Sequence, residues 1–241
     1  MATLIARPVR ARTDDYFFGA MALVMLGSVL FGFAHTYFLA GMVMAPLQSR
    51  LVHFHGAAFS CWIFLFLIQT TLISVGKVRV HRTLGSAGAV LAPTMMVLGI
   101  WTNCAMVRRG DAPPGFTVPM AFTLNNLEVI LFAGLVGWAI AVRTNRPIHK
   151  RLMLLATLGI MGPAISRWPL AFMHGNPIWV PAFFYAEVLT VLVYDLVTRH
   201  KAYWQTVVAT VAVMSLFWVS LAISGTPWMV RLLGWVLRGA G

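Results

Sequence analysis

Seven histidines, six acidic residues and a few amides are the side chains in this chain that could bind a metal, ligate a haem or relay protons. Two of the acids, Glu128 and Glu187, lie inside long apolar stretches. An ionised group in such a place costs several kcal/mol unless it faces the protein interior and finds a partner there. The sequence therefore predicts a buried polar site.

Most of the polar residues within the apolar stretches lie near one end of them, which we expect to be the outer end. Imidazole and carboxylate together can hold a transition metal, and the expected ligands are His35, His55, Glu128 and Glu187. The expected lining of the same outer cavity is His53, Trp62, Gln69, Asn103, Asn125 and Arg167. Two alternatives are a proton relay and a haem ligated through imidazole. In a third, Arg167 neutralises Glu128 or Glu187, and the other polar groups only bond helices together.

Helical phase limits which of these side chains can point inward together. His55, Trp62 and Gln69 recur every seven residues and form one stripe. His53 lies about 200° around the helix from His55, so the two cannot hold one ion while that segment is helical. Asn125 and Glu128 share a face of their own helix.

His81 and His149 form a second candidate site at the opposite ends of the apolar stretches. Each precedes a basic residue where a predicted helix starts, in Val80-His81-Arg82-Thr83-Leu84 and Ile148-His149-Lys150-Arg151-Leu152. They could contact lipid phosphates, or they could be axial ligands of a haem b near the inner surface. Asp195, close to Arg199, is expected to form an ordinary helix-end ion pair of modest strength.

The elements that position these residues are predicted to be seven transmembrane helices. The chain has 241 residues, of which 60% are hydrophobic and only 10% charged, whereas soluble proteins are about one quarter charged. A helix of about 20 apolar residues spans the bilayer core. The fold class is all-α, a polytopic membrane protein in a single domain over residues 1–241. The predicted spans are Phe17–Leu39, Leu51–Val75, Thr83–Val107, Met120–Val142, Leu152–Phe172, Ile178–Val197 and Val207–Ser224.

The net charge of +12 does not indicate nucleic acid, because Lys and Arg lie at the helix ends. Twelve lie on the side of the amino terminus and six on the other: Arg50, Arg108, Arg109, Arg167, Arg231 and Arg238. The positive-inside rule predicts a cytoplasmic head over residues 1–15 and a carboxyl terminus in the periplasm. Residues 226–241 are predicted to form a short amphipathic helix in the outer interface, with Trp228 and Trp235 in the headgroup layer.

Two resemblances add to this picture. Gly32-Phe33-Ala34, His53-x-His55, His81-Arg82-x-Leu84-Gly85, His149-Lys150-Arg151-Leu152-Met153 and Gly162-Pro163 together resemble a group of bacterial seven-helix membrane proteins without an assigned activity. This resemblance implies the fold and an inner-membrane location, but no catalytic residue. A weaker similarity is to b561-type di-haem cytochromes. It implies at most one haem site, at His81 and His149, because the fourth predicted span has no histidine.

The leading functional hypothesis from the sequence is a membrane-embedded redox protein that binds a metal or haem. The alternative is a non-enzymatic subunit of a membrane complex or a small-solute transporter, in which the polar residues pack and gate. The chain has no Gly-rich phosphate loop and no His-Glu-x-x-His motif, which argues against nucleotide-driven transport and zinc-protease chemistry. The expected partners are the lipid bilayer and either other membrane proteins or further copies of this chain.

Overall fold

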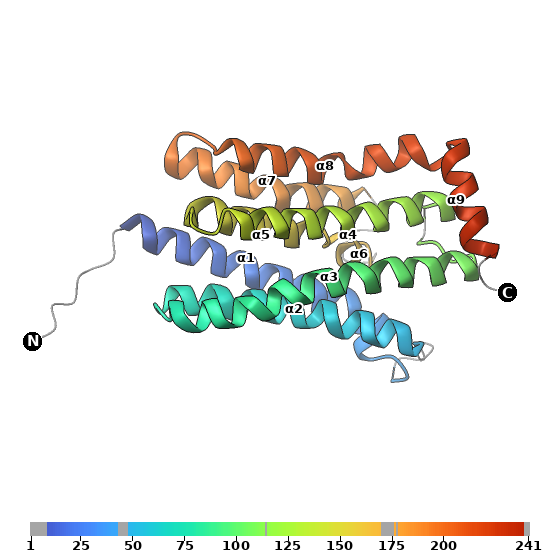
Figure 1. Cartoon of the computed structure of the whole chain (residues 1–241), viewed down its shortest axis with the longest axis horizontal. Coiled ribbons are helices and arrows are strands. Elements are labelled where there is room, and N and C mark those ends of the chain that lie inside the picture. Colours follow the sequence, from blue (N-terminus) through green and yellow to red (C-terminus); the bar gives the residue numbers. More distant parts are fainter. Residues whose placement is uncertain (1–8, 43–47, 114, 170–175, 177, 239–241) are drawn as a thin grey trace, which may run out of the picture.

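The computed structural model describes residues 9–42, 48–113, 115–169, 176 and 178–238, and for residues 9–12 the backbone only. Every regular element in this part of the chain is a helix (Figure 1). The elements are α1 (Val9–Phe33), the π-helix η1 (Ala34–Phe38), α2 (Arg50–Ser74), α3 (Val78–Arg109), α4 (Val118–Ala141), α5 (Arg146–Leu158), α6 (Gly162–Ile165), α7 (Trp179–Arg199), α8 (Trp204–Ser224) and α9 (Pro227–Arg238).

Six helical segments of the described chain are long and apolar enough to cross a membrane, and the protein is a multi-pass membrane protein. They are Thr13–Phe38, Arg50–Ser74, Val78–Arg109, Val118–Ala141, Trp179–Arg199 and Trp204–Ser224. Each corresponds to a predicted span, with ends that differ by up to five residues.

The fifth predicted span, Leu152–Phe172, is not one continuous helix. It consists of the 13-residue α5, an interruption after Leu158, and the single-turn α6. Gly159, Gly162 and Pro163 explain the interruption, since glycine disfavours helix and proline lacks the N–H that continues it. Residues 170–172 lie outside the described residues. The number of continuous spans is therefore six in the described chain rather than seven.

The long helices run side by side, and α9 crosses one end of the bundle (Figure 1). We call this the α9 end, where α1 and α3 finish and α2 and α4 begin. At the other end, the amino-terminal end, α1 and α3 begin and α2, α4 and α7 finish. The two ends hold different polar groups, so each is described separately below.

Small residues let the helices pack closely. A Cβ on Gly88 of α3 would lie 3.1 Å from the Leu65 side chain of α2, and one on Gly99 would lie 2.9 Å from Val129 of α4. Glycines of α3 thus allow close contact with both α2 and α4, as is common where lipid provides no hydrophobic drive for helix association. A Cβ on Gly32 of α1 would lie only 2.0 Å from the Ala164 carbonyl oxygen of α6.

The helix α9 is amphipathic, as its sequence predicts. Met229, Leu233 and Val236 are buried against α3 and α4 in a small apolar cluster with Val107 and Phe122. Trp228 and Trp235 lie on its exposed side. Residues 239–241, the rest of the predicted helix over 226–241, lie outside the described residues.

Candidate functional site

The polar residues predicted to line one outer cavity lie in separate places near the α9 end. His35 is exposed on η1. His53 is also exposed, and its Nδ1 is 3.2 Å from the Tyr37 hydroxyl. These two histidines therefore do not face the interior of the bundle.

Glu128 lies in one deeply buried place. Its side chain on α4 is only 7% exposed, and no described residue donates a hydrogen bond to its carboxylate. Arg167, which follows α6, is within electrostatic range of both Glu128 and His55. However, Nη1 of Arg167 donates to the Pro163 carbonyl at 2.7 Å, and its guanidinium lies 4.9 Å from the centre of the Phe33 ring. Arg167 thus lies near Glu128, as the neutralisation hypothesis requires, but the two side chains form no ion-pair contact.

His55 packs its ring on Phe59, at 4.2 Å between centroids, and its buried Nδ1 has no partner. The other two members of its stripe also face the protein. Trp62 is buried and donates from Nε1 to Thr157 Oγ1 of α5 at 3.1 Å, and Gln69 donates to the His81 carbonyl at 3.2 Å. The stripe spans the length of α2, so it does not form a single site.

Of the remaining outer candidates, Glu187 and Asn125 have local partners. Glu187 of α7 accepts a hydrogen bond from Ser28 of α1 at 3.4 Å. Asn125 contacts the Met106 sulfur at 4.0 Å, and Asn103 is buried on α3. No group of three or more His, Cys, Asp or Glu side chains among the described residues is placed to hold a metal ion. His35, His55, Glu128 and Glu187 therefore do not come together as a ligand set.

Two shallow hollows of the described part of the structure are lined by other residues. One, of about 300 Å³, lies between α3 and α9 and is lined by Trp101, Cys104, Arg108, Trp235 and Val236. The other, of about 40 Å³, lies at Arg199, Lys201, Ala202 and Tyr203, next to the loop between α7 and α8.

A fully buried ion pair joins α5 to α7 at the amino-terminal end. Arg151 of α5 and Asp195 of α7 both have fully buried side chains, at 0% exposure. Nε of Arg151 lies 2.7 and 2.8 Å from the two carboxylate oxygens, and Nη2 also bonds Oδ1. The expected pair of Asp195 with Arg199 is present, with the Arg199 Nε 3.9 Å from Oδ1. Arg151 is a second and closer partner that the sequence analysis did not identify.

A second ion pair joins α1 to the same two helices. The Asp14 carboxylate bonds Lys150 through one oxygen and accepts from the Tyr194 hydroxyl at 2.5 Å through the other. The Tyr194 ring stacks on Phe17 at 3.8 Å between centroids. Asp14, predicted to lie in the cytoplasmic head, is thus buried within α1. Together the two pairs hold α1, α5 and α7.

His81 and His149 meet close to these pairs. They lie within the first four residues of α3 and α5 and are within electrostatic range of each other. Nδ1 of His149 is 2.8 Å from the Ala139 carbonyl oxygen at the end of α4. Because a carbonyl only accepts, Nδ1 carries the hydrogen, and the Nε2 lone pair is left for another group.

The His81 ring lies close to the Gln69 backbone at the end of α2, and its buried Nδ1 has no hydrogen-bond partner in the structure. His149 thus has one ring nitrogen bonded to a backbone carbonyl, and His81 has a buried ring nitrogen without a hydrogen-bond partner. Histidines that ligate metals almost always donate their second ring N–H to a carbonyl or carboxylate in this manner.

These residues fit the axial ligands of a haem better than the ligands of a bare ion. A protein site for a transition metal usually supplies three or four ligands, whereas a porphyrin supplies four nitrogens itself and needs one or two from the protein. The α2–α3 contact is closed at Gly85 and Gly88, where an added Cβ would lie 3.4 Å from Gln69 Nε2 and 3.1 Å from Leu65. A haem on these histidines would therefore be held at the very end of the bundle.

Comparison with known protein families, with curated proteins and with solved structures finds no match to this chain.

Proposed function

We propose that the protein is a membrane-embedded redox protein that carries one haem b at its amino-terminal end, with His81 and His149 as the axial ligands. The observation that carries this proposal is the unused, buried Nδ1 of His81 within electrostatic range of a histidine whose Nδ1 is already bonded to a backbone carbonyl. When bound, the haem would supply one-electron chemistry.

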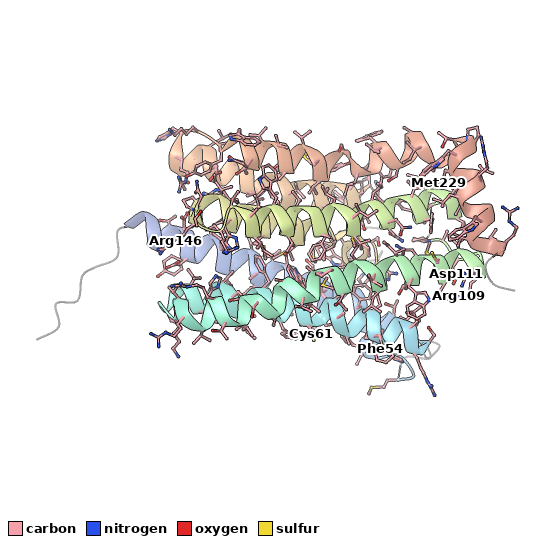
Figure 2. The ribbon with its side chains drawn as sticks, viewed as in Figure 1. Phe54, Cys61, Arg109, Asp111, Arg146 and Met229 are labelled. Carbon is pink, nitrogen blue, oxygen red and sulfur yellow. The ribbon has the colours of Figure 1, made fainter. Side chains whose placement is uncertain are left out.

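The chain's own residues would orient and tune such a group. The bond from His149 to the Ala139 carbonyl fixes the tautomer and the ring plane and makes Nε2 a stronger donor to iron. Arginines surround this end and are exposed: Arg79, Arg82, Arg143 and Arg146, the last labelled in Figure 2. Guanidinium groups pair well with carboxylates, so these side chains suit the two propionates that a haem b carries.

The proposal includes the location and topology of the chain. The excess of Lys and Arg at the amino-terminal end supports a bacterial inner membrane with that end in the cytoplasm and α9 in the periplasm. The chain leaves α4 at the amino-terminal end and starts α7 toward the other, with α5 and α6 between (Figure 1). We therefore infer that this broken segment is a seventh crossing.

An absorption spectrum of the purified protein tests the haem. The protein would be expressed with sufficient haem, extracted in mild detergent, and recorded oxidised and reduced. We expect a Soret band in the wild type that is lost in His81→Ala and in His149→Ala. His200→Ala is the matched control, because His200 is an exposed histidine at the same end of the bundle.

Metal analysis of the same samples separates haem iron from a bare ion. Iron in equal amounts with extracted haem supports the proposal. A colourless wild-type protein under haem-sufficient expression, or a Soret band that survives in the double variant, would overturn it.

A second candidate function is supported by one observation at the opposite end. The interruption between α5 and α6 lies beside the buried Glu128, since a Cβ on Gly162 would be 3.0 Å from Glu128 Oε1. Interrupted helices beside polar groups form the substrate sites of many secondary transporters. A colourless protein that takes up protons in a pH-jump experiment on reconstituted vesicles, and does not do so as Glu128→Gln, would favour the transporter.

A further inference from the structure

The α6 segment, residues 159–168, lies next to two acids of membrane-crossing helices that the proposed haem does not use. Within this segment, α6 contacts α1 and α7 inside the bundle (Figure 1). Glu128 lies on α4, 10 residues after that helix begins (128 − 118), and Glu187 lies on α7, 8 residues after its start (187 − 179). At 1.5 Å per residue, these positions are about 15 Å and 12 Å from the α9 end of their helices. Both are deeper than a lipid headgroup layer of roughly 5–8 Å, so both carboxyl groups lie at the level of the hydrocarbon.

Glu128 faces the start of α6. Its side chain is 7% exposed, and a Cβ on Gly162 would lie 3.0 Å from its Oε1, so the missing side chain at position 162 makes room for the carboxyl group. Among the described residues, Arg167 is the one charged side chain within electrostatic range of Glu128. The Nη1 of Arg167 donates to the Pro163 carbonyl instead. Glu128 therefore has a cation nearby but no hydrogen-bond donor from the described chain.

Glu187 faces the other end of the α6 segment. The Ser28 hydroxyl of α1 donates to Glu187 Oε1 at 3.4 Å, and the carbonyl of the same serine accepts from Trp168 Nε1 at 3.3 Å. Trp168 also packs on Phe183, which lies one turn before Glu187 on the same face of α7, with 5.2 Å between ring centroids. The second oxygen of Glu187, Oε2, is buried and has no hydrogen-bond partner. No charged side chain of the described residues lies within electrostatic range of this acid.

A proton is the ligand that these surroundings favour. An ionised carboxylate in hydrocarbon is strongly unfavourable unless it is paired and hydrogen-bonded. Glu128 lacks the donor, and Glu187 lacks the cation and has one donor near the outer limit of hydrogen-bond distance. A proton removes the charge and needs neither a cation nor a cavity. The two hollows described above are lined by other residues, and the described chain places no metal-binding cluster here, so a metal ion or an organic solute fits less well.

We propose that Glu128 and Glu187 are two reversible proton-binding sites inside the membrane, one beside the start of α6 and one beside Trp168. Each carboxylate takes one proton from the aqueous phase, forms one O–H bond and loses its negative charge, and the reverse step returns the proton to water. The proposal extends the transporter alternative, which involves Glu128 alone. It depends neither on transport nor on the haem at the other end of the bundle.

Infrared spectroscopy tests the proposal, because the carbonyl stretch of a carboxylic acid is separate from the bands of a carboxylate. The purified protein would be reconstituted in nanodiscs of an ether-linked phosphatidylcholine, which has no carbonyl group of its own. Difference spectra would be recorded from slightly below neutral to alkaline pH. Ordinary Asp and Glu side chains are ionised throughout this range. We therefore expect the wild type to show a carbonyl band that is replaced by carboxylate bands as the pH rises.

Variants assign the band to the two acids. Glu128→Gln and Glu187→Gln keep the shape of the side chain, and each should remove one component of the band, whereas the double variant should remove all of it. Asp111→Asn is the matched control and should leave the band unchanged, because Asp111 is an exposed acid of the loop between α3 and α4. His81→Ala, which would lose the haem and its propionates, should also keep the band. A failure of the haem proposal is thereby distinguished from a failure of this one.

Three results would overturn the proposal. The first is a wild-type protein without a carbonyl band that titrates in this range, which would mean that neither acid exchanges a proton there. The second is a band that the double variant retains. The third is a single Gln variant that leaves the band unchanged, since the pair would then contain only one proton site. The first result needs the wild type alone, so the test does not depend on the folding of a variant.

Discussion

The buried acids at the two ends of the bundle differ in whether they form ion pairs. At the amino-terminal end, Asp14 and Asp195 each contact a cation and at least one hydroxyl. At the α9 end, Glu128 is equally buried but has no ion-pair contact among the described residues, and Arg167 bonds a backbone carbonyl instead.

The charged side chains at the amino-terminal end therefore connect helices to one another, whereas Glu128 at the α9 end does not. The ion pairs join α1, α5 and α7, whose sequence positions are far apart. At the α9 end the helices are joined by close backbone contact at Gly32 and by the apolar cluster around Leu233. Polar groups there that lack protein partners are the ones available to ligands, water or protons.

The largest expected effect comes from breaking the buried ion pair. Replacing Arg151 with Met should lower the free energy of unfolding by about 3–5 kcal/mol, because it leaves the Asp195 carboxylate buried without its partner. Unfolding in mixed micelles, followed by circular dichroism, measures it. The double variant Arg151→Met with Asp195→Leu should recover most of the loss, since apolar residues of similar size remove both charges.

An exposed ion pair provides the matched control. Arg109 and Asp111 also bond each other, but both side chains are about half exposed. Arg109→Gln should change stability by no more than about 1 kcal/mol. If Arg151→Met cost no more than this control, the ion pair could not be what holds the amino-terminal end together.

The sequence predicts the helices well because their signal is local. Long apolar runs and charged ends are properties of one segment at a time, and six of the predicted spans are helices in the structure. The break after Leu158 is also visible locally, in Gly159, Gly162 and Pro163. Whether this break divides the predicted span into two helices depends on how the segment packs, and the apolar residues alone do not show that.

The polar contacts were predicted less well, because they depend on which helices are neighbours. Asp195 has a basic residue four positions later, and sequence distance favours that pair. The structure contains that pair and adds a closer partner, Arg151, from 44 positions away. One signal was present: the segment Lys150-Arg151 places two cations at the start of an apolar run, and Asp14 and Asp195 are among the acids near the same membrane surface. Matching these charges by membrane depth would have suggested both pairs.

A smaller loss of stability is expected from disturbing the close backbone contact between α1 and α6, where no ion pair joins the helices. Gly32→Ala should destabilise the protein by about 1–3 kcal/mol, because the new methyl group would meet the Ala164 carbonyl and force α1 and α6 apart. Gly27→Ala on the same helix is the control. No atom lies within 4 Å of its added Cβ, so it should be neutral or stabilise by up to about 1 kcal/mol. Equal thermal shifts for the two variants would contradict the close contact.

The smallest change in stability is expected from replacing Glu128. This variant tests most directly whether the buried acids at the two ends of the bundle differ in ion pairing. Glu128→Gln keeps the shape of the side chain and removes only its ability to ionise. Since no described residue bonds the carboxylate, the change should alter the free energy of unfolding by less than about 1 kcal/mol, against several for Arg151→Met. The same mixed-micelle unfolding experiment measures both variants. A loss of 3 kcal/mol or more would mean that Arg167 and Glu128 form a true ion pair in the membrane, and the two ends of the bundle would then be alike.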